Sequence, residues 1–304
     1  MFSSLFLLQF LFKLPSIFFY MRFRLLITLC VLLNAGCAFL NFGDDQYQLR
    51  MATPGKDIVW VPSQADISTK MLVLAQVKSG DLVYDLGSGD GIIPIQAAKQ
   101  YGVRAVGIEY NPDLVALSKR NAIRENVQNL VTFKQGDVLV EDFSSATVVT
   151  LFLGDALNLK LMPIILKMKP GTRVVSNTFQ MGPWLPDQEV RVRSNETAIG
   201  SLNETAYLWI VPANIDGAWE FTGLPKMDRA TIRLTQSKQF FAGSIAQQGK
   251  QPIALEGGRV QGNGIEFRFE VNSKEYMFKG QINGLQMSGI LNGDPKLVVN
   301  GKRL

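Results

Sequence analysis

The segment VYDLGSGDG, residues 83–91, decides the fold. The β-rich run Leu82–Leu86 leads into it and predicts a strand, and Ile92–Tyr101 follows it with the character of a helix. Its three glycines allow a sharp turn and a close approach of a ligand, because no Cβ atom stands in the way. The segment therefore predicts a strand, a tight turn and a helix, with a ligand bound at the turn.

Two features separate this turn from the fingerprint of the dinucleotide-binding folds. Its glycines are spaced G-x-G-x-G rather than G-x-G-x-x-G. An acidic residue, Asp85, also stands two positions before Gly87. A carboxylate at this position would repel a pyrophosphate, but it suits a ligand that carries an ammonium and a sulfonium group. S-adenosylmethionine carries both groups, so the segment predicts a site for this cofactor.

Two further acidic residues stand where the next strands end. Glu109 closes the run Arg104–Glu109, 18 residues beyond Gly91, where a carboxylate can accept hydrogen bonds from both ribose hydroxyls. Asp137 follows the run Leu130–Gln135 and is placed to accept a hydrogen bond from the adenine amino group. The alternative for both residues is an ordinary solvated charge at the end of a strand.

The chain divides into two stretches of different texture. Strand-like and helix-like runs alternate from about residue 57 to 213, which predicts an α/β domain with a Rossmann-like, doubly wound sheet. From residue 215 to 304 the helical period is absent, and about eight short strands predict a small all-β domain, either a barrel or a sandwich. Its hairpin turns are predicted at Gly257-Gly258, Gly262-Asn263-Gly264, Asn283-Gly284 and Asn292-Gly293.

Residues 1–40 form a targeting or anchoring region. From Met21 the segment has a positively charged start, the apolar run Leu25–Leu33 and then several small residues. This order is typical of a secretory signal peptide. The alternatives are a lipoprotein signal that ends at Cys37 and a membrane anchor that is retained. Each of these interpretations predicts a protein that is exported or associated with a membrane.

The composition excludes several catalytic classes. The 304-residue chain contains no histidine, which excludes a Ser-His-Asp triad, a Cys-His pair and a His-ligated metal or haem. Its two cysteines, Cys30 and Cys37, both lie near the N-terminus, so the remainder has no thiol for catalysis or for a disulfide framework. Residues 1–37 contain three basic and no acidic residues, so only +2 of the net charge of +5 belongs to the rest. A body so close to neutral does not favour nucleic-acid binding.

Further motifs along the α/β region match one known family. The matching segments are Val61-Pro62-Ser63, VYDLGSGDG (83–91), AVGIE (105–109), Gln135-Gly136-Asp137, ATVVTLFL (146–153), LNLK (157–160) and KPGTRVV (169–175). With these segments the chain resembles the class I methyltransferases, whose fold is a seven-stranded Rossmann-like sheet. It is most similar to the small lysine N-methyltransferases that include the mitochondrial enzymes for the c-ring protein of ATP synthase and for the adenine nucleotide translocase.

The resemblance implies S-adenosylmethionine as cofactor and a protein lysine as methyl acceptor. It also places the segment before the first strand, with Pro62 and Ser63, near the methionine end of the cofactor. The predicted cofactor-binding residues are therefore Pro62, Ser63, Asp85, Gly87, Ser88, Gly89, Glu109 and Asp137.

The segment after the fourth strand bears on the acceptor. It reads LFLGD, residues 151–155, and lacks the Asn-Pro-Pro-Tyr-type and Pro-Cys motifs of methyltransferases for amide or adenine nitrogens and pyrimidine carbons. The resemblance implies an aromatic residue near Phe152, which would line an acceptor channel or simply belong to the core. Asp155 would orient the acceptor amine or cap the next helix. Three residues after the fifth strand would wall the acceptor pocket or pack in the core: Phe179, Met181 and Trp184.

Two classes of function fit these observations. The first is an S-adenosylmethionine-dependent methyltransferase that acts on a protein lysine or, alternatively, on a small molecule or lipid. The second is a non-catalytic, cofactor-binding module of the cell envelope. The complete set of acidic and glycine residues favours the enzyme, whereas the export-like N-terminus favours the module, because the cofactor is made in the cytosol. We predict the enzyme, with a membrane-associated protein as acceptor, no nucleic-acid partner and no metal.

Overall fold

The computed structural model describes residues 42–50, 52–61, 63, 65–193, 203–246, 249 and 251–304. The predicted signal or anchor segment, residues 1–40, lies outside the described residues, as does Pro62. The chain divides into two compact units, residues 1–51 and 52–304. The described part of the first unit contains one antiparallel pair of short strands, β1 (Phe42–Gly43) and β2 (Gln48–Leu49). Among the helices that the structure describes, none has the length and apolar character to cross a bilayer.

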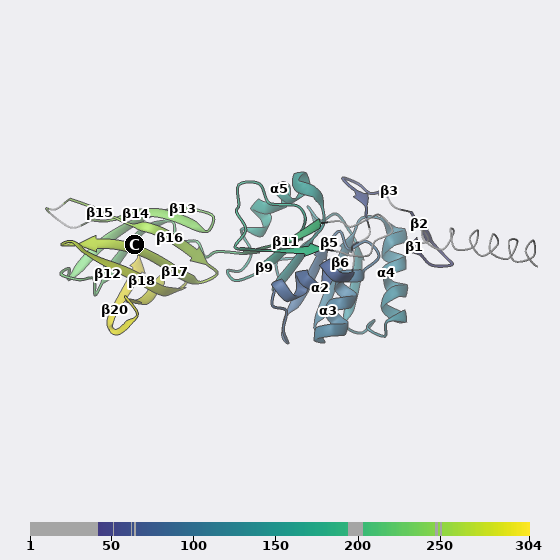
Figure 1. Ribbon diagram of the computed structural model, residues 1–304, viewed down its shortest axis with the longest axis horizontal. Helices are drawn as coiled ribbons and strands as arrows, with labels where there is room; N and C mark the ends of the chain where they lie inside the picture. The colour runs from purple at the N-terminus through teal and green to yellow at the C-terminus, as the bar shows by residue number, and fades with distance from the viewer. Residues whose placement is uncertain are drawn as a thin grey trace, which may run out of the picture. The chain divides into compact units, whose positions relative to one another are not determined.

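A seven-stranded sheet is the centre of the α/β region (Figure 1). Its strands are β5 (Leu82–Leu86), β6 (Arg104–Glu109), β7 (Val131–Gln135), β8 (Val148–Leu151), β9 (Arg173–Asn177), β10 (Gln188–Arg193) and β11 (Asn203–Ile210). They lie in the order β10-β11-β9-β8-β5-β6-β7. Strands β5 to β9 are parallel, and β11 pairs antiparallel with both β9 and β10. The predicted Rossmann-like, doubly wound sheet is thus confirmed.

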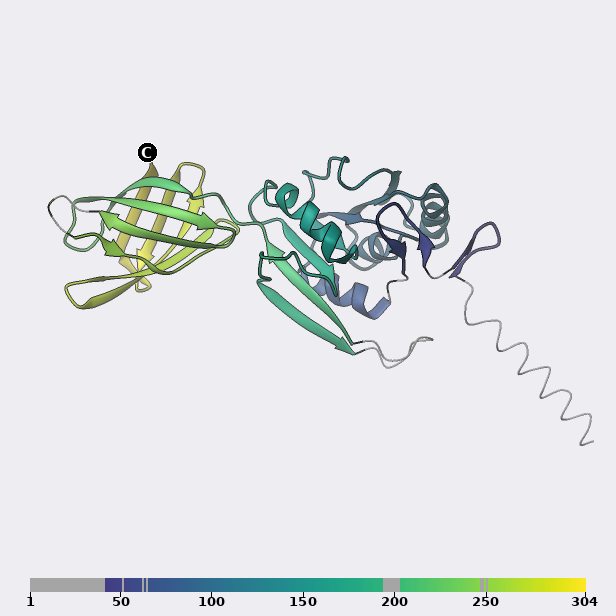
Figure 2. The ribbon, with the colours of Figure 1, turned by 90° about the horizontal axis from the view of Figure 1, so that it is seen from above.

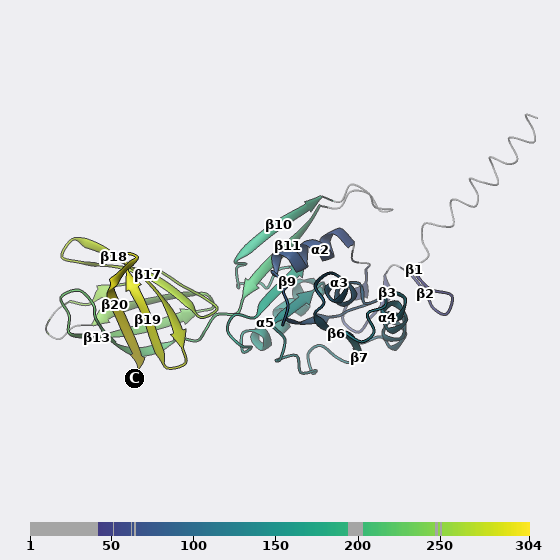
Figure 3. The ribbon, with the colours of Figure 1, turned by 90° about the horizontal axis from the view of Figure 1, so that it is seen from below.

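Among the described residues, four helices accompany the sheet. They are α2 (Ala65–Leu74), α3 (Ile92–Tyr101), α4 (Pro112–Arg124) and α5 (Gly154–Ile165). Helices α3 and α4 connect β5, β6 and β7, and α5 connects β8 to β9, as parallel strands require. Helix α2 packs against β9, β10 and β11 (Figure 3). Two apolar cores result, one shared with α2 and α3 and the other with α5.

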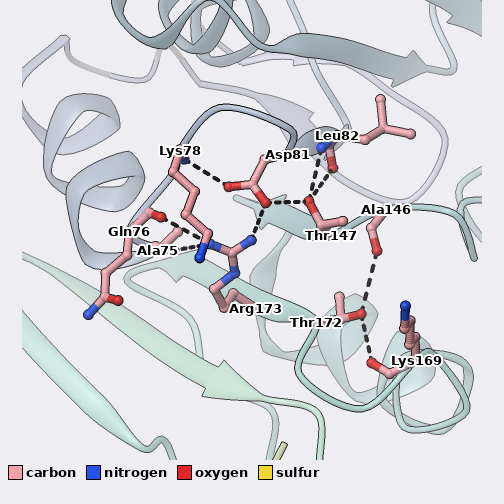
Figure 4. Close-up of polar contacts among 10 residues, drawn as sticks. All are labelled: Ala75, Gln76, Lys78, Asp81, Leu82, Ala146, Thr147, Lys169, Thr172 and Arg173. Carbon is pink, nitrogen blue, oxygen red and sulfur yellow. Dashed lines mark hydrogen bonds and ion pairs between the residues drawn. The ribbon is translucent and has the colours of Figure 1, made fainter.

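The amino end of β5 is held by a buried ion pair (Figure 4). Asp81 accepts hydrogen bonds from the Arg173 guanidinium, from the Thr147 hydroxyl at 2.8 Å and from the Lys78 backbone N–H at 2.8 Å. Burial by itself would raise the pKa of Asp81, but these hydrogen bonds outweigh it and the pKa is lowered. Arg173 also donates to two carbonyl oxygens just after α2, Ala75 and Gln76, at 3.0 Å each. This cluster therefore fixes the end of α2 to the start of β9.

Residues 217–303 form a closed antiparallel barrel (Figure 2). Eight strands follow one another around it, and the pairing of β13 with β14 closes the ring; the two-residue β15 adds to β14. Because the sheet closes on itself, the predicted all-β region is a barrel and not a sandwich. The strands are β12 (Gly217–Thr222), β13 (Arg229–Ser237), β14 (Phe240–Ala246), β15 (Ile253–Ala254), β16 (Glu256–Gln261), β17 (Gly264–Val271), β18 (Lys274–Asn283), β19 (Gln286–Leu291) and β20 (Asp294–Arg303).

Aromatic side chains fill the interior of the barrel. The rings of Phe267 and Phe278 have centroids 4.8 Å apart, and Phe221 meets both of them edge-on. Trp219 is fully buried beside them and donates its indole N–H to the Ile215 carbonyl at 2.8 Å. The interior of this barrel is therefore filled by side chains, as is usual for small barrels.

That residues 57–213 and 215–304 fold as independent domains stays a prediction.

One of the predicted hairpin turns is wrong. Gly257 and Gly258 lie inside β16, at an irregularity of the register between Glu256 and Arg259. A Cβ atom on Gly258 would lie 2.4 Å from the Phe241 carbonyl oxygen, so this glycine serves the close approach of β14 rather than a turn. The other three predicted turns join β16 to β17, β18 to β19 and β19 to β20, and are confirmed.

Candidate cofactor and active site

A pocket lies at the carboxyl ends of the parallel strands β5, β6 and β8. The connection after β5 leads to β6 on one side, whereas β8 lies on the other, so the strand order reverses here. Ligands of open α/β sheets bind at such a switch point. The pocket encloses about 860 Å³ of space, including the solvent at its mouth.

The glycine turn forms one wall of the pocket. The backbone N–H groups of Gly87 and Ser88 both donate to the Ile108 carbonyl oxygen, at 2.8 and 3.0 Å. Gly87 and Gly89 have φ angles of 75° and 53°, in the left-handed region that glycine adopts without strain. A Cβ atom at Gly89 would lie 2.5 Å from Nε1 of Trp60. Glycine is therefore required by conformation and by space.

Glu109 connects the turn to the end of β6. Its Oε2 accepts from the N–H of Gly89 and its Oε1 from the N–H of Asn111, each at 2.9 Å. The carboxylate is buried at the pocket wall, and its two oxygens retain lone pairs for further donors. This is the arrangement that a ribose diol needs, although the ligand contact itself stays a prediction.

Asp85 is the most deeply buried acid of the pocket, with only 3% of the residue exposed. Burial raises the pKa of Asp85 to about 7; the hydrogen bond from the Thr150 hydroxyl, at 2.6 Å, opposes the rise and the charges of Glu109 and Asp90 add to it. Among the described residues no cationic side chain forms an ion pair with this carboxyl group. A cationic ligand would stabilise its ionised form.

Asp137 faces a hairpin that the sequence analysis missed. Strands β3 (Thr53–Pro54) and β4 (Val59–Trp60) form this hairpin, and residues 53–61 all line the pocket. Lys56 at its tip forms an ion pair with Oδ2 of Asp137, whose Oδ1 accepts from the Leu139 N–H at 2.9 Å. The hydrogen bond from Lys56 lowers the pKa of Asp137. The turn-forming Pro54-Gly55 pair before a Val-Trp dipeptide was the available signal in the sequence.

The acceptor-side residues separate into two groups. Phe152 lines the pocket, and its ring stacks on that of Phe179 with centroids 5.8 Å apart. Met181 and Trp184 are fully buried in the core beside α5, so packing is their role. Asp155 is exposed and does not line the pocket; its Oδ1 accepts from the Gln180 N–H at 2.9 Å. It therefore ties the segment after β9 to α5, and no side chain caps the start of that helix.

The structure brings most of the predicted site residues together in one pocket. Those that line it are Ser63, Asp85, Gly87, Ser88, Gly89, Glu109, Asp137 and Phe152. Pro62 lies outside the described residues, and Asp155 stands apart. In the described part of the chain, no cluster of three or more acidic, cysteine or histidine side chains could hold a metal ion.

The pocket fits S-adenosylmethionine by the chemistry of its donors and acceptors. The buried carboxyl group of Asp85, which has no ion-pair partner among the described residues, can bind a cation. The carboxylate of Glu109, at the neighbouring strand end, can accept hydrogen bonds from hydroxyl groups, and the glycine backbone forms a wall that a ligand can approach closely. The buried hydroxyl of Ser88 has no hydrogen-bond partner in the described part of the chain, which leaves it open to a ligand. Tryptophan and phenylalanine rings, those of Trp60 and Phe152, supply apolar surface.

Comparison with known proteins agrees with this fit. The family model of the ANTKMT methyltransferase domain matches residues 85–188. The chain is 38% identical over 156 residues to a protein-lysine N-methyltransferase of Saccharolobus islandicus, a match that covers 51% of this chain and 94% of that protein. It is 34% identical over 149 residues to the adenine nucleotide translocase lysine N-methyltransferase of Mus musculus, with 48% of this chain and 62% of that enzyme covered. The chain thus spans less than two thirds of the latter.

A solved structure is also similar. The RNA methyltransferase from Salinibacter ruber, crystallised with S-adenosyl-L-homocysteine, is 43% identical to this chain. The match covers 55% of this chain and 99% of the other, with a TM-score of 0.46.

Proposed function

Because this chain belongs to the family of S-adenosylmethionine-dependent protein-lysine N-methyltransferases, we propose that it methylates a lysine side chain of a protein associated with a membrane. The observation that carries the proposal is the pocket itself, which is lined by Asp85, Glu109 and Phe152, with the ring of Phe179 stacked on that of Phe152. The carboxyl groups suit the cofactor, and the rings suit the methylene chain of a lysine.

We assign the cofactor contacts by the chemistry of each group. Asp85 is assigned to the ammonium group, Glu109 to the ribose hydroxyls and Asp137 to the adenine amino group. Asp137 is already paired with Lys56, so the β3–β4 hairpin and the adenine share one carboxylate. Pro62 and Ser63 are assigned to the methionine end by family resemblance.

The chemistry asked of the protein is modest. When bound, the cofactor supplies a methyl group whose bond to sulfur breaks as the lone pair of the acceptor nitrogen forms the new bond. The acceptor amine must therefore be neutral, and an apolar slot lined by Phe152 favours loss of its proton, because burial lowers the pKa of a lysine. Holding the two reactants in line can supply about 7–11 kcal/mol at best.

The membrane part of the proposal rests on residues 1–40. Their pattern predicts export or anchoring, and an anchored enzyme would meet membrane-bound acceptors at a raised effective concentration. Arg22 and Arg24 precede the apolar run, which predicts that the body of the protein lies outside. Cell fractionation with protease protection of a tagged full chain tests this. Protection from external protease would contradict the outward orientation.

Transfer of labelled methyl groups tests the acceptor. Full-length protein is incubated with labelled S-adenosylmethionine and membrane fractions of a strain that lacks it, and the Asp85→Asn variant is the control. Label in methylated lysine supports the proposal. Label in lipid or small molecules would show that the acceptor is not a protein lysine. Label in RNA would indicate an RNA methyltransferase, the activity named for the Salinibacter ruber relative. Cofactor binding without any label would favour a binding module.

A further inference from the structure

A buried polar network lies at the carboxyl end of β9. The side-chain amide of Asn177 donates to Oε1 of Glu204, at the start of β11, at 2.9 Å. The Thr178 hydroxyl donates to Oδ1 of Asn177 at 2.9 Å, and the Thr178 N–H donates to the Thr205 carbonyl at 2.7 Å. These bonds join the last residues of β9 to the neighbouring strand and fix the Glu204 carboxylate.

Glu204 retains one carboxylate oxygen without a partner among the described residues. Only 8% of the residue is exposed, and its buried Oε2 has no hydrogen bond to any of them. By contrast, the buried carboxylates of Asp81 and Glu109 have hydrogen bonds to both oxygens. The buried carboxyl group of Asp85 has one, from Thr150, and it is the group already assigned to the cofactor. A buried acceptor without a donor is costly, so this oxygen calls for a donor from outside.

Glu204 lies on the face of the sheet that α2 covers. The register pairs Ala206 with Asn177, so Glu204, two residues before Ala206, points to the same face as both. Ala206 belongs to the core shared with α2. Since Arg173 at the start of β9 bonds to carbonyls just after α2, that helix runs antiparallel to β9 and begins near Asn177.

Two chain segments connect this position to the pocket. Ser63, which lines the pocket, comes two residues before the start of α2. Phe179 comes two residues after Asn177 and stacks on Phe152, which also lines the pocket. Glu204 does not itself line the pocket. The register pairs Leu151 of β8 with Ser176 of β9, so Asn177, which holds the Glu204 carboxylate, stands level with Phe152 at the carboxyl edge of the sheet.

The backbone at this point is strained. Thr178 has a φ of 62°, in the left-handed region, where a β-branched residue is a genuine outlier. Such strain persists only where the surroundings enforce it, most often at functional sites. Here the enforcing contacts are the bonds of Thr178 to Asn177 and Thr205, next to Phe179.

We propose that Oε2 of Glu204 binds the ammonium group of the acceptor lysine as this side chain arrives, before the amine loses its proton for methyl transfer, and so selects a cationic side chain. An ammonium group has three donors and no acceptor, which matches a carboxylate oxygen that lacks a donor. Asn158 also has a buried oxygen without a partner in the described part of the chain, but it bonds to Ser176, on the opposite face of β9, and it carries no charge. The inference rests on the proposed function, because it presumes a lysine acceptor.

The test compares Glu204→Gln with wild type on poly-L-lysine as the acceptor. Glutamine retains an oxygen for Asn177 but loses the charge. We expect KM for poly-L-lysine to rise at least tenfold, with the dissociation constant for S-adenosylmethionine changed less than twofold by calorimetry. Glu189→Gln, an exposed carboxylate on β10, is the matched control and should leave KM unchanged. An unchanged KM in Glu204→Gln would overturn the inference.

A binding measurement without turnover gives a second readout. With S-adenosylhomocysteine present, n-butylammonium should bind the wild-type protein and should bind Glu204→Gln at least tenfold more weakly, whereas n-butanol should not distinguish the two. Equal binding of n-butylammonium to both would overturn the inference. If Glu204→Gln does not fold, the two ligands are compared on the wild-type protein instead, and equal binding of n-butylammonium and n-butanol would overturn the inference. Wild type that binds the cofactor but methylates no lysine overturns the proposed function, and the inference with it.

Discussion

Two aspartates at opposite ends of β5 have contrasting surroundings. Asp81 stands before the strand and receives hydrogen bonds from Arg173, Thr147 and the Lys78 backbone (Figure 4). Asp85 lies near the other end of the strand and receives one from the Thr150 hydroxyl, with Glu109 and Asp90 as nearby charges. Both are buried, yet the pKa of Asp81 is lowered and that of Asp85 is raised to about 7.

The contrast separates a structural site from a ligand site. At the amino ends of the strands the protein supplies the cation itself, so the buried charge stabilises the fold. At the carboxyl ends the carboxyl group awaits a cation from outside, so its burial serves binding. This agrees with the general distribution of function in parallel sheets, where the carboxyl edge binds ligands.

The largest effect is expected from Arg173→Ala. Removing one partner of a buried ion pair leaves Asp81 as an uncompensated charge, so the free energy of unfolding should fall by about 3–5 kcal/mol. Urea denaturation followed by circular dichroism measures this. Arg229→Ala, which breaks the exposed pair with Glu220 in the barrel, is the control and should change stability little. Equal losses for both variants would refute a structural role for the amino-end cluster.

The pH dependence of stability should be opposite for the two aspartates. The folded pKa of Asp85 is raised, so the unfolded chain loses this proton first, and the contribution of Asp85 to stability should fall as pH rises from about 4 to about 7. The slope for one proton is about 1.4 kcal/mol per pH unit. The folded pKa of Asp81 is lowered, so the contribution of Asp81 to stability is lost as the pH falls from the pKa of the unfolded chain through the lower pKa of the folded protein. Urea titrations of Asp85→Asn against wild type at several pH values isolate the first effect; a difference that does not change between pH 4 and 7 would contradict it.

Binding of S-adenosylmethionine should depend on Glu109. Glu109→Ala removes a charge-assisted acceptor and frees the Gly89 N–H, so binding to the protein should weaken by about 1.5–3 kcal/mol. Isothermal titration calorimetry measures the loss. Glu125→Gln, at an exposed ion pair with Lys99, is the control and should bind the cofactor as wild type does. If S-adenosylmethionine gave no measurable heat of binding with the wild-type protein, the assignment of this cofactor to the pocket at the carboxyl edge of the sheet would be wrong.

The smallest effect is expected at the hairpin. Lys56→Ala removes the ion pair with Asp137, so the β3–β4 hairpin should open more readily and the cofactor should dissociate a few-fold faster. Added salt should speed release from wild type and have less influence on the variant, because salt screens this exposed pair. Stopped-flow release of a fluorescent cofactor analogue measures both, with Lys99→Ala as control. If the variant released the cofactor at the wild-type rate and with the wild-type salt dependence, the ion pair between Lys56 and Asp137 would not slow cofactor release.

Sequence reasoning was accurate for features that depend on neighbours along the chain. The strand, glycine turn and helix around residues 83–91, and the acids that end β6 and follow β7, were each predicted and line one pocket. The glycine turns at 262–264, 283–284 and 292–293 were predicted for the same reason. It failed at Gly257-Gly258, because a glycine that lets two strands approach resembles a glycine that turns the chain.

The sequence by itself determined the fold class, the cofactor class and the edge of the sheet where the site lies, because these depend on short-range patterns of strand, glycine and acid. Only the tertiary structure decided which partner each charge has. Lys56 reaches Asp137 and Asn177 reaches Glu204 across long stretches of chain, and Met181 and Trp184 are buried rather than lining the pocket. The raised pKa of Asp85 likewise requires its burial among strands that meet through the sheet order. Such pairings follow from which strands become neighbours in space, and residue spacing along the chain does not contain that information.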